Sequence, residues 1–341
     1  MKHGHKQMKI SDTAACWSAA AALFAAATLA AFVARAAEPA STTSAPPAST
    51  TSTPPAMHHG QSTFASPEDA AKALADAMRA NDRKQIWHVL GPGASKLIHS
   101  GDPVQDNKAR EAFVAAYDQS VKIERSGEDK ATLVVGPEDF PFPYPLVMKD
   151  GRWQFDAKRG DEQVLDRRIG RNEISAIKVC LAYVDAQREY AALDRNGNGL
   201  LEYAQKFTSS PGKHDGLYWE TKEGEPPSPL GPLVARARSQ GYGQQGPGTA
   251  TPYHGYFYKI LTGQGDSASG GAYSYIVNGK MIGGFGLVAY PARWGNSGVM
   301  TFLCNQDGVV YEKNLGSETA ALVSKMTLFD PDSTWEKSKD Q

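Results

Sequence analysis

Two changes of periodicity constrain the fold of this chain more than any other feature. Between residues 66 and 119, apolar side chains recur at helical spacing, as at Ala70, Leu74, Ala77 and Met78. Four short runs that alternate apolar and polar residues follow, up to residue 157. The order then repeats, because a long helical run over residues 161–193 precedes strand-like runs over residues 253–315. Helices followed by strands predict the α+β class, here two domains that each pack helices on an antiparallel sheet.

The first domain is expected over residues 64–160. Ser66 is a good N-cap, Pro67 suits the first helical position, and Glu68 and Asp69 favour the positive end of a helix. Two more helices are expected over residues 82–92 and 107–119, and turn signals such as "SGED" and "KDG" separate the strands. This order of elements, together with the "DGRWQFD" strand, resembles the cone-shaped nuclear-transport-factor-2-like fold.

The N-terminus has the features of an export signal. Residues 1–36 combine three lysines, an Ala-rich uncharged run and the small-residue cleavage pattern "ARAAEPA". We therefore expect a periplasmic or secreted protein, attached to a membrane only if this leader stays uncleaved. Residues 37–63 are rich in Ser, Thr and Pro and cannot bury enough apolar area to fold, so they predict a disordered linker.

Charge and cysteine content narrow the function classes. The 36 Lys and Arg residues balance 37 Asp and Glu residues without a run of like charge, which argues against nucleic acid as a partner. Cys180 and Cys304 follow the leader, each within an apolar run. An oxidising compartment permits a disulfide between them, and two buried free thiols are the alternative.

Six stretches of the sequence are distinctive enough to identify relatives. They are "GRNEISAIKVCLAYVDAQREYA", "GNGLLEYAQKF", "PGKHDGLYWE", "EPPSPLGPLV", "PYHGYFYKILT" and "GVMTFLCNQDGVVYEKNLG". From about residue 64 to residue 335 the chain is similar to a bacterial exported family, the domain-of-unknown-function family 2950. This resemblance implies no activity. The long helix and the strands of residues 161–335 also resemble the headgroup of type IV pilins and pseudopilins, and that likeness concerns the fold, because a whole domain precedes the helix.

The stretch "ALDRNGNGLLEYAQ" at residues 192–205 is a candidate calcium loop. An EF-hand loop that starts at Asp194 places Asn196, Asn198, the Leu200 carbonyl and Glu202 at ligand positions, with Leu201 at the position that usually turns inward. Gln205 stands where the loop needs a bidentate carboxylate. We therefore expect weak structural calcium binding, and the alternative is a turn built from Asn and Gly.

The remaining polar and aromatic residues suggest a binding cleft in the second domain. His214, Asp215, Trp219, His254 and Tyr256 are the candidate ligand-binding residues. No complete catalytic constellation, phosphate loop or dinucleotide motif is visible, so we expect a non-catalytic binding or assembly module that acts on an envelope protein or polymer. The alternative is a periplasmic hydrolase of envelope glycan or peptide, which requires His214, Asp215 and His254 to converge.

Overall fold

The first helix begins at its predicted capping residue, Ser66, and aspartates cap two of the helices that follow. The computed structural model describes residues 60–243 and 251–339. In it the Ser66 hydroxyl accepts a hydrogen bond from the Asp69 amide at the start of α1. Asp82 and Asp102 accept amide hydrogen bonds in the same way at the starts of α2 and α4. The elements are α1 (Pro67–Arg79), α2 (Arg83–Leu90), the 3-10 helix η1 (Pro92–Ala94), α3 (Ser95–Ile98) and α4 (Pro103–Gln119).

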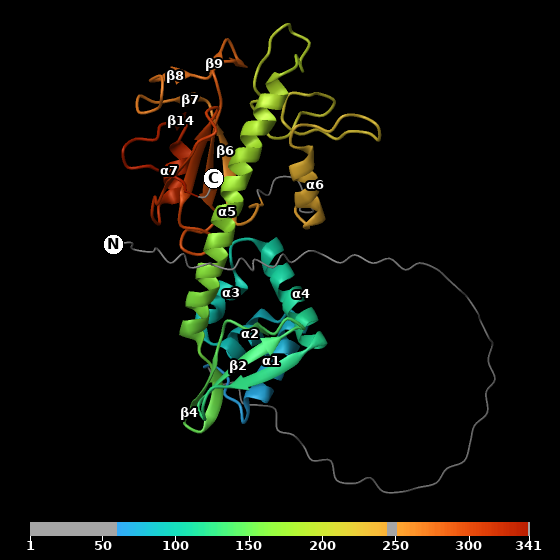
Figure 1. Ribbon diagram of the computed structural model, residues 1–341, viewed down its shortest axis with the longest axis vertical. Helices are drawn as coiled ribbons and strands as arrows, with labels where there is room; N and C mark the ends of the chain where they lie inside the picture. Colours follow the sequence, from blue (N-terminus) through green and yellow to red (C-terminus); the bar gives the residue numbers. More distant parts are fainter. Residues whose placement is uncertain (1–59, 244–250, 340–341) are drawn as a thin grey trace, which may run out of the picture. The chain divides into compact units, whose positions relative to one another are not determined.

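An antiparallel sheet follows these helices and forms the N-terminal lobe with them (residues 60–164; Figure 1). Its strands are β1 (Val121–Arg125), β2 (Lys130–Val135), β3 (Phe140–Pro141), β4 (Leu146–Lys149) and β5 (Arg152–Phe155), in the order β1-β2-β4-β5 with β3 beside β2. Leu133, Leu146 and Phe155 have no exposed surface and pack against α1 and α2 in one hydrophobic cluster. Burial of such side chains is the main stabilising contribution to this lobe.

A single helix runs through both halves of the described chain (Figure 1). α5 spans Ala157–Ala191, 35 residues, which corresponds to about 52 Å. Its first turns belong to the N-terminal lobe, because Val164 lies in that hydrophobic cluster. Its later residues, such as Ile177 and Tyr183, lie in a second cluster in the C-terminal lobe (residues 172–339). The helix is therefore continuous across residue 160, the predicted end of the first domain.

The C-terminal lobe is built on a second antiparallel sheet, ordered β15-β13-β12-β11-β6. Successive side chains of its strands point to opposite faces of the sheet, and both faces are buried. Leu287 and Phe302 face the α5 side, whereas Val288 and Leu303 belong to a third cluster with Val323 of the helix α7. The elements are α6 (Gly231–Ser239), β6 (Tyr256–Leu261), β7 (Gly263–Gln264), β8 (Tyr273–Ser274), β9 (Ile276–Val277), β10 (Lys280–Met281), β11 (Gly286–Pro291), β12 (Thr301–Asn305), β13 (Val310–Lys313), α7 (Thr319–Lys325), β14 (Leu328–Phe329) and β15 (Glu336–Lys337).

Buried polar side chains join the two lobes. The Arg168 guanidinium on α5 donates to the Lys96 carbonyl and to Asn296 Oδ1, both at 2.6 Å. One turn further, Asn172 accepts a hydrogen bond from Gln105 and donates to the Ser297 carbonyl at 2.8 Å. Because these contacts are hydrogen bonds rather than apolar packing, the lobes keep separate hydrophobic clusters within one compact unit.

The α+β prediction is confirmed, and the structure corrects three local expectations. Gln61, assigned to the linker, donates hydrogen bonds to the Val89, Leu90 and Phe155 carbonyls and so belongs to the N-terminal lobe. The stretch "YAQKF" at residues 203–207, whose composition favours a short helix, forms none, because Tyr203 forms a β-bridge with Met281. Residues 209–234 are rich in Gly and Pro, and α6, which was not predicted, begins within them at Gly231. The predicted signal peptide and most of the linker lie outside the described residues.

Candidate functional site

His214, Asp215 and Trp219 lie together beside the end of α5. The rings of His214 and Trp219 stack with centroids 4.3 Å apart, and the Tyr190 hydroxyl on α5 donates to the His214 carbonyl at 2.6 Å. The Asp215 carboxylate accepts hydrogen bonds from the Lys206 ammonium at 2.7 Å and from the amide and hydroxyl of Ser210. Lys206 first, and then Ser210, hold the pKa of Asp215 well below its usual value. Asp215 is therefore a turn-forming carboxylate that is already paired.

His254 and Tyr256 belong to the junction of the lobes instead. His254 has a φ of 50°, and its Nδ1 lies 3.4 Å from the Gln105 side-chain amide. Burial is the main reason that the pKa of His254 lies below its usual value. Tyr256 has no exposed surface, and its hydroxyl donates to the Met300 carbonyl at 2.9 Å. Gly298 is required beside this ring, because an added Cβ would lie 2.1 Å from the hydroxyl.

These two groups do not converge into one site. His254 is linked through Gln105 to Asn172, whereas His214 is bound by Tyr190, eighteen residues further along the same helix. At 1.5 Å per residue these two contact points on α5 are about 27 Å apart. The cleft that would unite His214 and His254 is therefore not formed, and the hydrolase alternative loses its three-residue site.

The predicted calcium loop is closed by hydrogen bonds among its own ligands. The side-chain amides of Asn196 and Asn198 both donate to Glu202 Oε1 at 2.8 Å. The Lys280 ammonium lies 3.1 Å from the same oxygen. The Asp194 carboxylate accepts the backbone amides of residues 198 and 199 instead of facing Glu202.

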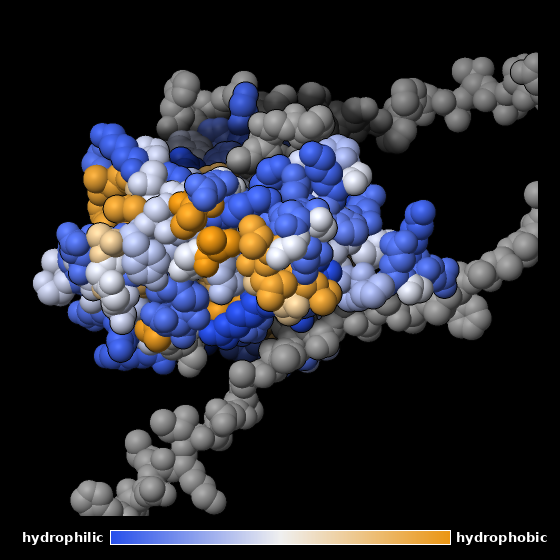
Figure 2. Space-filling model, turned by 90° about the horizontal axis from the view of Figure 1, so that it is seen from above, coloured by the Kyte–Doolittle hydropathy of each residue, from blue (hydrophilic) through white to orange (hydrophobic). Residues whose placement is uncertain are grey.

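This arrangement does not fit a calcium ion. A calcium site needs six or more oxygen ligands turned to one point, and here a lysine already supplies the positive charge beside Glu202. Leu201 is 62% exposed and Leu200 is 46% exposed, so the apolar side chain expected to turn inward does not. Figure 2, which views the end of the molecule where α5 finishes, shows hydrophobic side chains at the surface there. In the described ranges, no group of three or more His, Cys, Asp or Glu residues is placed to hold a metal ion.

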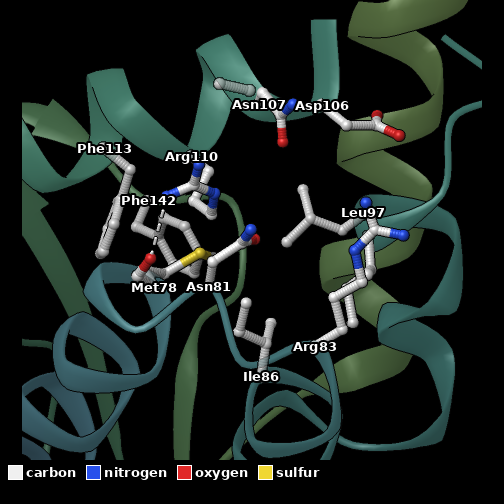
Figure 3. A pocket seen from close by; sticks show the side chains of 12 residues that line it. Met78, Asn81, Arg83, Ile86, Leu97, Asp106, Asn107, Arg110, Phe113 and Phe142 are labelled. Carbon is white, nitrogen blue, oxygen red and sulfur yellow. Dashed lines mark hydrogen bonds between the residues drawn. The ribbon is translucent and has the colours of Figure 1, made fainter. Parts of the chain in front are cut away.

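The N-terminal lobe contains a pocket that the sequence analysis missed (Figure 3). Its volume is about 80 Å³, and it lies among α1, α2, α3 and α4. The apolar part is formed by Met78, Ile86, Leu97, Ile98, Ala109, Phe113 and Phe142, and the polar part by Asn81, Arg83, Asp106, Asn107 and Arg110.

The guanidinium of Arg110 is the most distinctive group in this pocket. Its side chain is 19% exposed, Nη1 donates to the Met78 carbonyl at 3.3 Å, and Nη2 lies 3.5 Å from Glu111 Oε1. Its Nε is buried with no hydrogen-bond partner in the described structure. Arg83 contributes a second cation, and its Nη1 lies 3.4 Å from His99 Nδ1. Both guanidinium groups therefore retain donors for a bound molecule.

One carboxylate also lines the pocket. Both oxygens of Asp106 accept the Ser100 amide at 3.2 Å. Burial raises the pKa of Asp106 above its usual value, and the hydrogen bonds from Ser100 oppose that shift. Asp106 thus serves the turn before α4, and the positive charge of the arginines dominates the pocket.

A helical pattern could have indicated part of this pocket. Asp106, Arg110 and Phe113 follow one another at spacings of four and three residues, so they share one face of α4. Ala109 beside them leaves room on that face. Phe142 and Leu97 come from other segments, and helical spacing gives no information about them.

Cys180 and Cys304 face each other between α5 and β12 as free, fully buried thiols, with Cys304 Sγ 3.7 Å from the Cys180 carbonyl. Burial, together with the neighbouring Cys180, raises the pKa of the Cys304 thiol. These thiols therefore contribute to packing and are not exposed to reagents in solution.

Comparison with known proteins gives one match. Neither the curated proteins nor the solved structures contain a match to this chain, so the two fold resemblances remain expectations. In the described part of the chain, no helix has both the length and the apolar composition of a membrane span. A family model described as "Protein of unknown function (DUF2950)" matches residues 61–338. The chain therefore belongs to the DUF2950 family.

Proposed function

We propose that this protein is an exported, non-catalytic binding module of the bacterial cell envelope, and that it binds its partner through the pocket of the N-terminal lobe. The observation that carries the proposal is the combination of an apolar floor with arginine donors that the protein itself leaves largely unused. Concave sites with apolar walls and a few placed polar groups are typical of ligand-binding sites.

The scaffold around the pocket supports this function. Met78 and Ile86 are 6% and 3% exposed and are fixed in the hydrophobic cluster of the lobe. The N-caps of α2 and α4 set the directions of the two helices that carry Arg83 and Arg110. A pocket on such capped, packed helices is formed before binding, which reduces the entropy lost on association.

Export is the second part of the proposal, and the leader at residues 1–36 supports it. Fractionation should find the protein outside the cytoplasm, with a new N-terminus near residue 37 or 38. Full-length protein in the cytosol would contradict it.

A pull-down from envelope extract tests binding through the pocket. Ala109 lines the pocket and is exposed, so Ala109→Phe should fill it without disturbing the core. Ala115→Phe, an exposed site on the same helix that does not line the pocket, is the matched control. We expect a protein or polymer that the unmodified chain and Ala115→Phe retain and Ala109→Phe loses. Equal recovery by all three would show that the pocket is not the binding site.

The hydrolase alternative has no comparable support. It requires His214 and Asp215 to meet His254, and these residues contact points on α5 that are about 27 Å apart.

A further inference from the structure

The pocket of the N-terminal lobe contains unused hydrogen-bond donors in one particular arrangement. Arg110 projects from α4 and Arg83 from α2, on opposite sides of the opening, with Asn107 pointing toward the space between them (Figure 3). The Arg110 guanidinium has only long contacts, at 3.3 and 3.5 Å, and an unpartnered Nε. A planar group with two acceptor oxygens matches a guanidinium, because it can accept two parallel N–H bonds.

The size of the pocket limits the rest of the ligand. A volume of about 80 Å³ holds roughly five to eight water-sized groups. The walls beneath the arginines are Phe113, Phe142, Ile86 and Leu97, which favour a compact ring or a branched alkyl group. A long chain or a sugar would extend beyond this space.

Charge decides between the possible anions. Two arginines and one carboxylate, Asp106, line this pocket. The residues that line the pocket thus carry a single net positive charge, which suits a monoanion, and Glu111, whose Oε1 lies 3.5 Å from Arg110, is outside this lining. A phosphate dianion would meet Asp106 at short range, and its strong hydration is poorly replaced by apolar walls.

Resting on the proposed binding function, we infer that the pocket binds a small organic acid with one carboxylate and a compact apolar body. The carboxylate lies at Arg110 and Arg83, and the apolar body contacts Phe113 and Phe142. Phenylacetate and 3-methylbutanoate have this chemistry and serve as probes.

Calorimetric titration of the purified full chain tests the inference without any substitution. Phenylacetate should bind with a Kd on the order of 1 mM or tighter. Phenylacetamide, which has the same shape without the charge, should bind at least about tenfold more weakly, and phenethylamine should not bind. Equal binding of phenylacetate and phenylacetamide would overturn the inference, because the arginines would then contribute nothing.

Substitutions locate the bound acid. Arg110→Gln should weaken phenylacetate binding at least about tenfold and leave phenylacetamide unchanged. Lys108→Gln removes the same charge from the same helix outside the pocket and is the control. Ala109→Phe should abolish binding of both probes, and persistent binding in this variant would place the acid elsewhere. If no acid binds at 10 mM, on the order of ten times the expected Kd, the ligand class is wrong. The proposed function then still stands if Ala109→Phe loses an envelope component in the pull-down.

Discussion

The fully buried side chain of Asp102 joins segments that are far apart in the sequence. Its Oδ1 accepts the Val104 and Gln105 amides and so caps α4. Its Oδ2 accepts the Tyr242 hydroxyl at 2.7 Å and the Gly255 amide at 3.0 Å. One carboxylate therefore orients the helix that carries Arg110 and also ties it to the C-terminal lobe.

The Asp102→Asn substitution should separate these two roles. Asn is as good an N-cap as Asp, so capping survives, but its amide nitrogen cannot accept hydrogen bonds from Tyr242 and Gly255. We expect a loss of about 1–3 kcal/mol in the free energy of unfolding, measured in urea. Asp82→Asn, which caps α2 at an exposed position, should change it by less than about 0.5 kcal/mol. Equal losses in both variants would mean that Oδ2 has no structural role.

Protonation of His254 should destabilise the protein. Because the pKa of His254 is lowered in the fold from 6.5, the unfolded chain binds more protons between the folded value and 6.5. Stability is therefore full above pH 6.5 and decreases as pH falls toward the folded pKa. Asp102 opposes this shift, whereas Lys108 and Arg236 add to it. We expect the melting temperature to decrease as the pH is lowered from about 7.5 to about 5.5, because this range brackets the unperturbed His pKa near 6.5.

The control for this pH dependence is His254→Asn. Asn tolerates the φ of 50° at this position and does not titrate. The pH-dependent difference in midpoint between the variant and the unmodified protein isolates the contribution of His254. Parallel curves across this range would show that another group causes the loss.

At the scale of elements, the sequence predicted helices and strands well where local signals were strong. The Ser66 cap and Pro67 predicted the start of α1, and the alternation of apolar and polar residues predicted β1, β2, β4 and β5. α6 was missed because Pro232 and the surrounding glycines favour a loop, and Pro at the first turn of a helix is equally acceptable.

Long-range contacts explain the remaining errors and the missed pocket. Tyr203 pairs with Met281, 78 residues away, and this pairing overrides the local helical pattern at "YAQKF". The pocket likewise requires Phe142 to meet Phe113 across the lobe, with ring centroids 5.1 Å apart. In the predicted calcium loop, local sequence indicates a turn, but Lys280, whose ammonium lies 3.1 Å from Glu202, comes from another hairpin.

The loop after α5 gives a prediction about calcium. Because the Lys280 ammonium occupies the cation position beside Glu202, millimolar calcium should leave the melting midpoint of the unmodified protein unchanged relative to chelator. Lys280→Gln removes that ammonium from a carboxylate whose side chain is 6% exposed, and should lower the free energy of unfolding by about 1–3 kcal/mol. Lys280→Arg is the control and should be close to the unmodified protein. A calcium-induced rise in the unmodified protein would show that the loop rearranges around the ion.

At the scale of the whole molecule, the two lobes share one helix but not one core. The hydrophobic cluster of the N-terminal lobe draws its members from residues 70–164, and the other two clusters from residues 176–329. Between them, α5 carries Arg168 and Asn172, whose hydrogen bonds reach both lobes. The lobes should therefore fold as separate fragments, provided that α5 is cut after the first turns, which pack on the N-terminal lobe.

This packing decides where a stable N-terminal fragment ends. Gly160 lies against the Tyr144 ring so closely that an added Cβ would be 2.0 Å from it. Asp161 accepts the Tyr144 hydroxyl at 2.8 Å, and Val164 is part of the hydrophobic cluster. A fragment of residues 60–157 lacks all three contacts and exposes the buried Tyr144, whereas a fragment of residues 60–170 keeps them.

We therefore expect residues 60–170 to unfold cooperatively in urea, and residues 60–157 to be less stable. The lost burial of Val164 contributes about 1.5–3 kcal/mol and the lost partner of the Tyr144 hydroxyl about 1–3 kcal/mol, a large part of the stability of a small domain. Tyr144→Phe in the longer fragment removes the hydroxyl alone and should account for the smaller part of the difference. If both fragments are equally stable, the first turns of α5 are dispensable. If the longer fragment shows no cooperative transition, the N-terminal lobe depends on the C-terminal lobe through Arg168 and Asn172, and the two lobes fold as one unit.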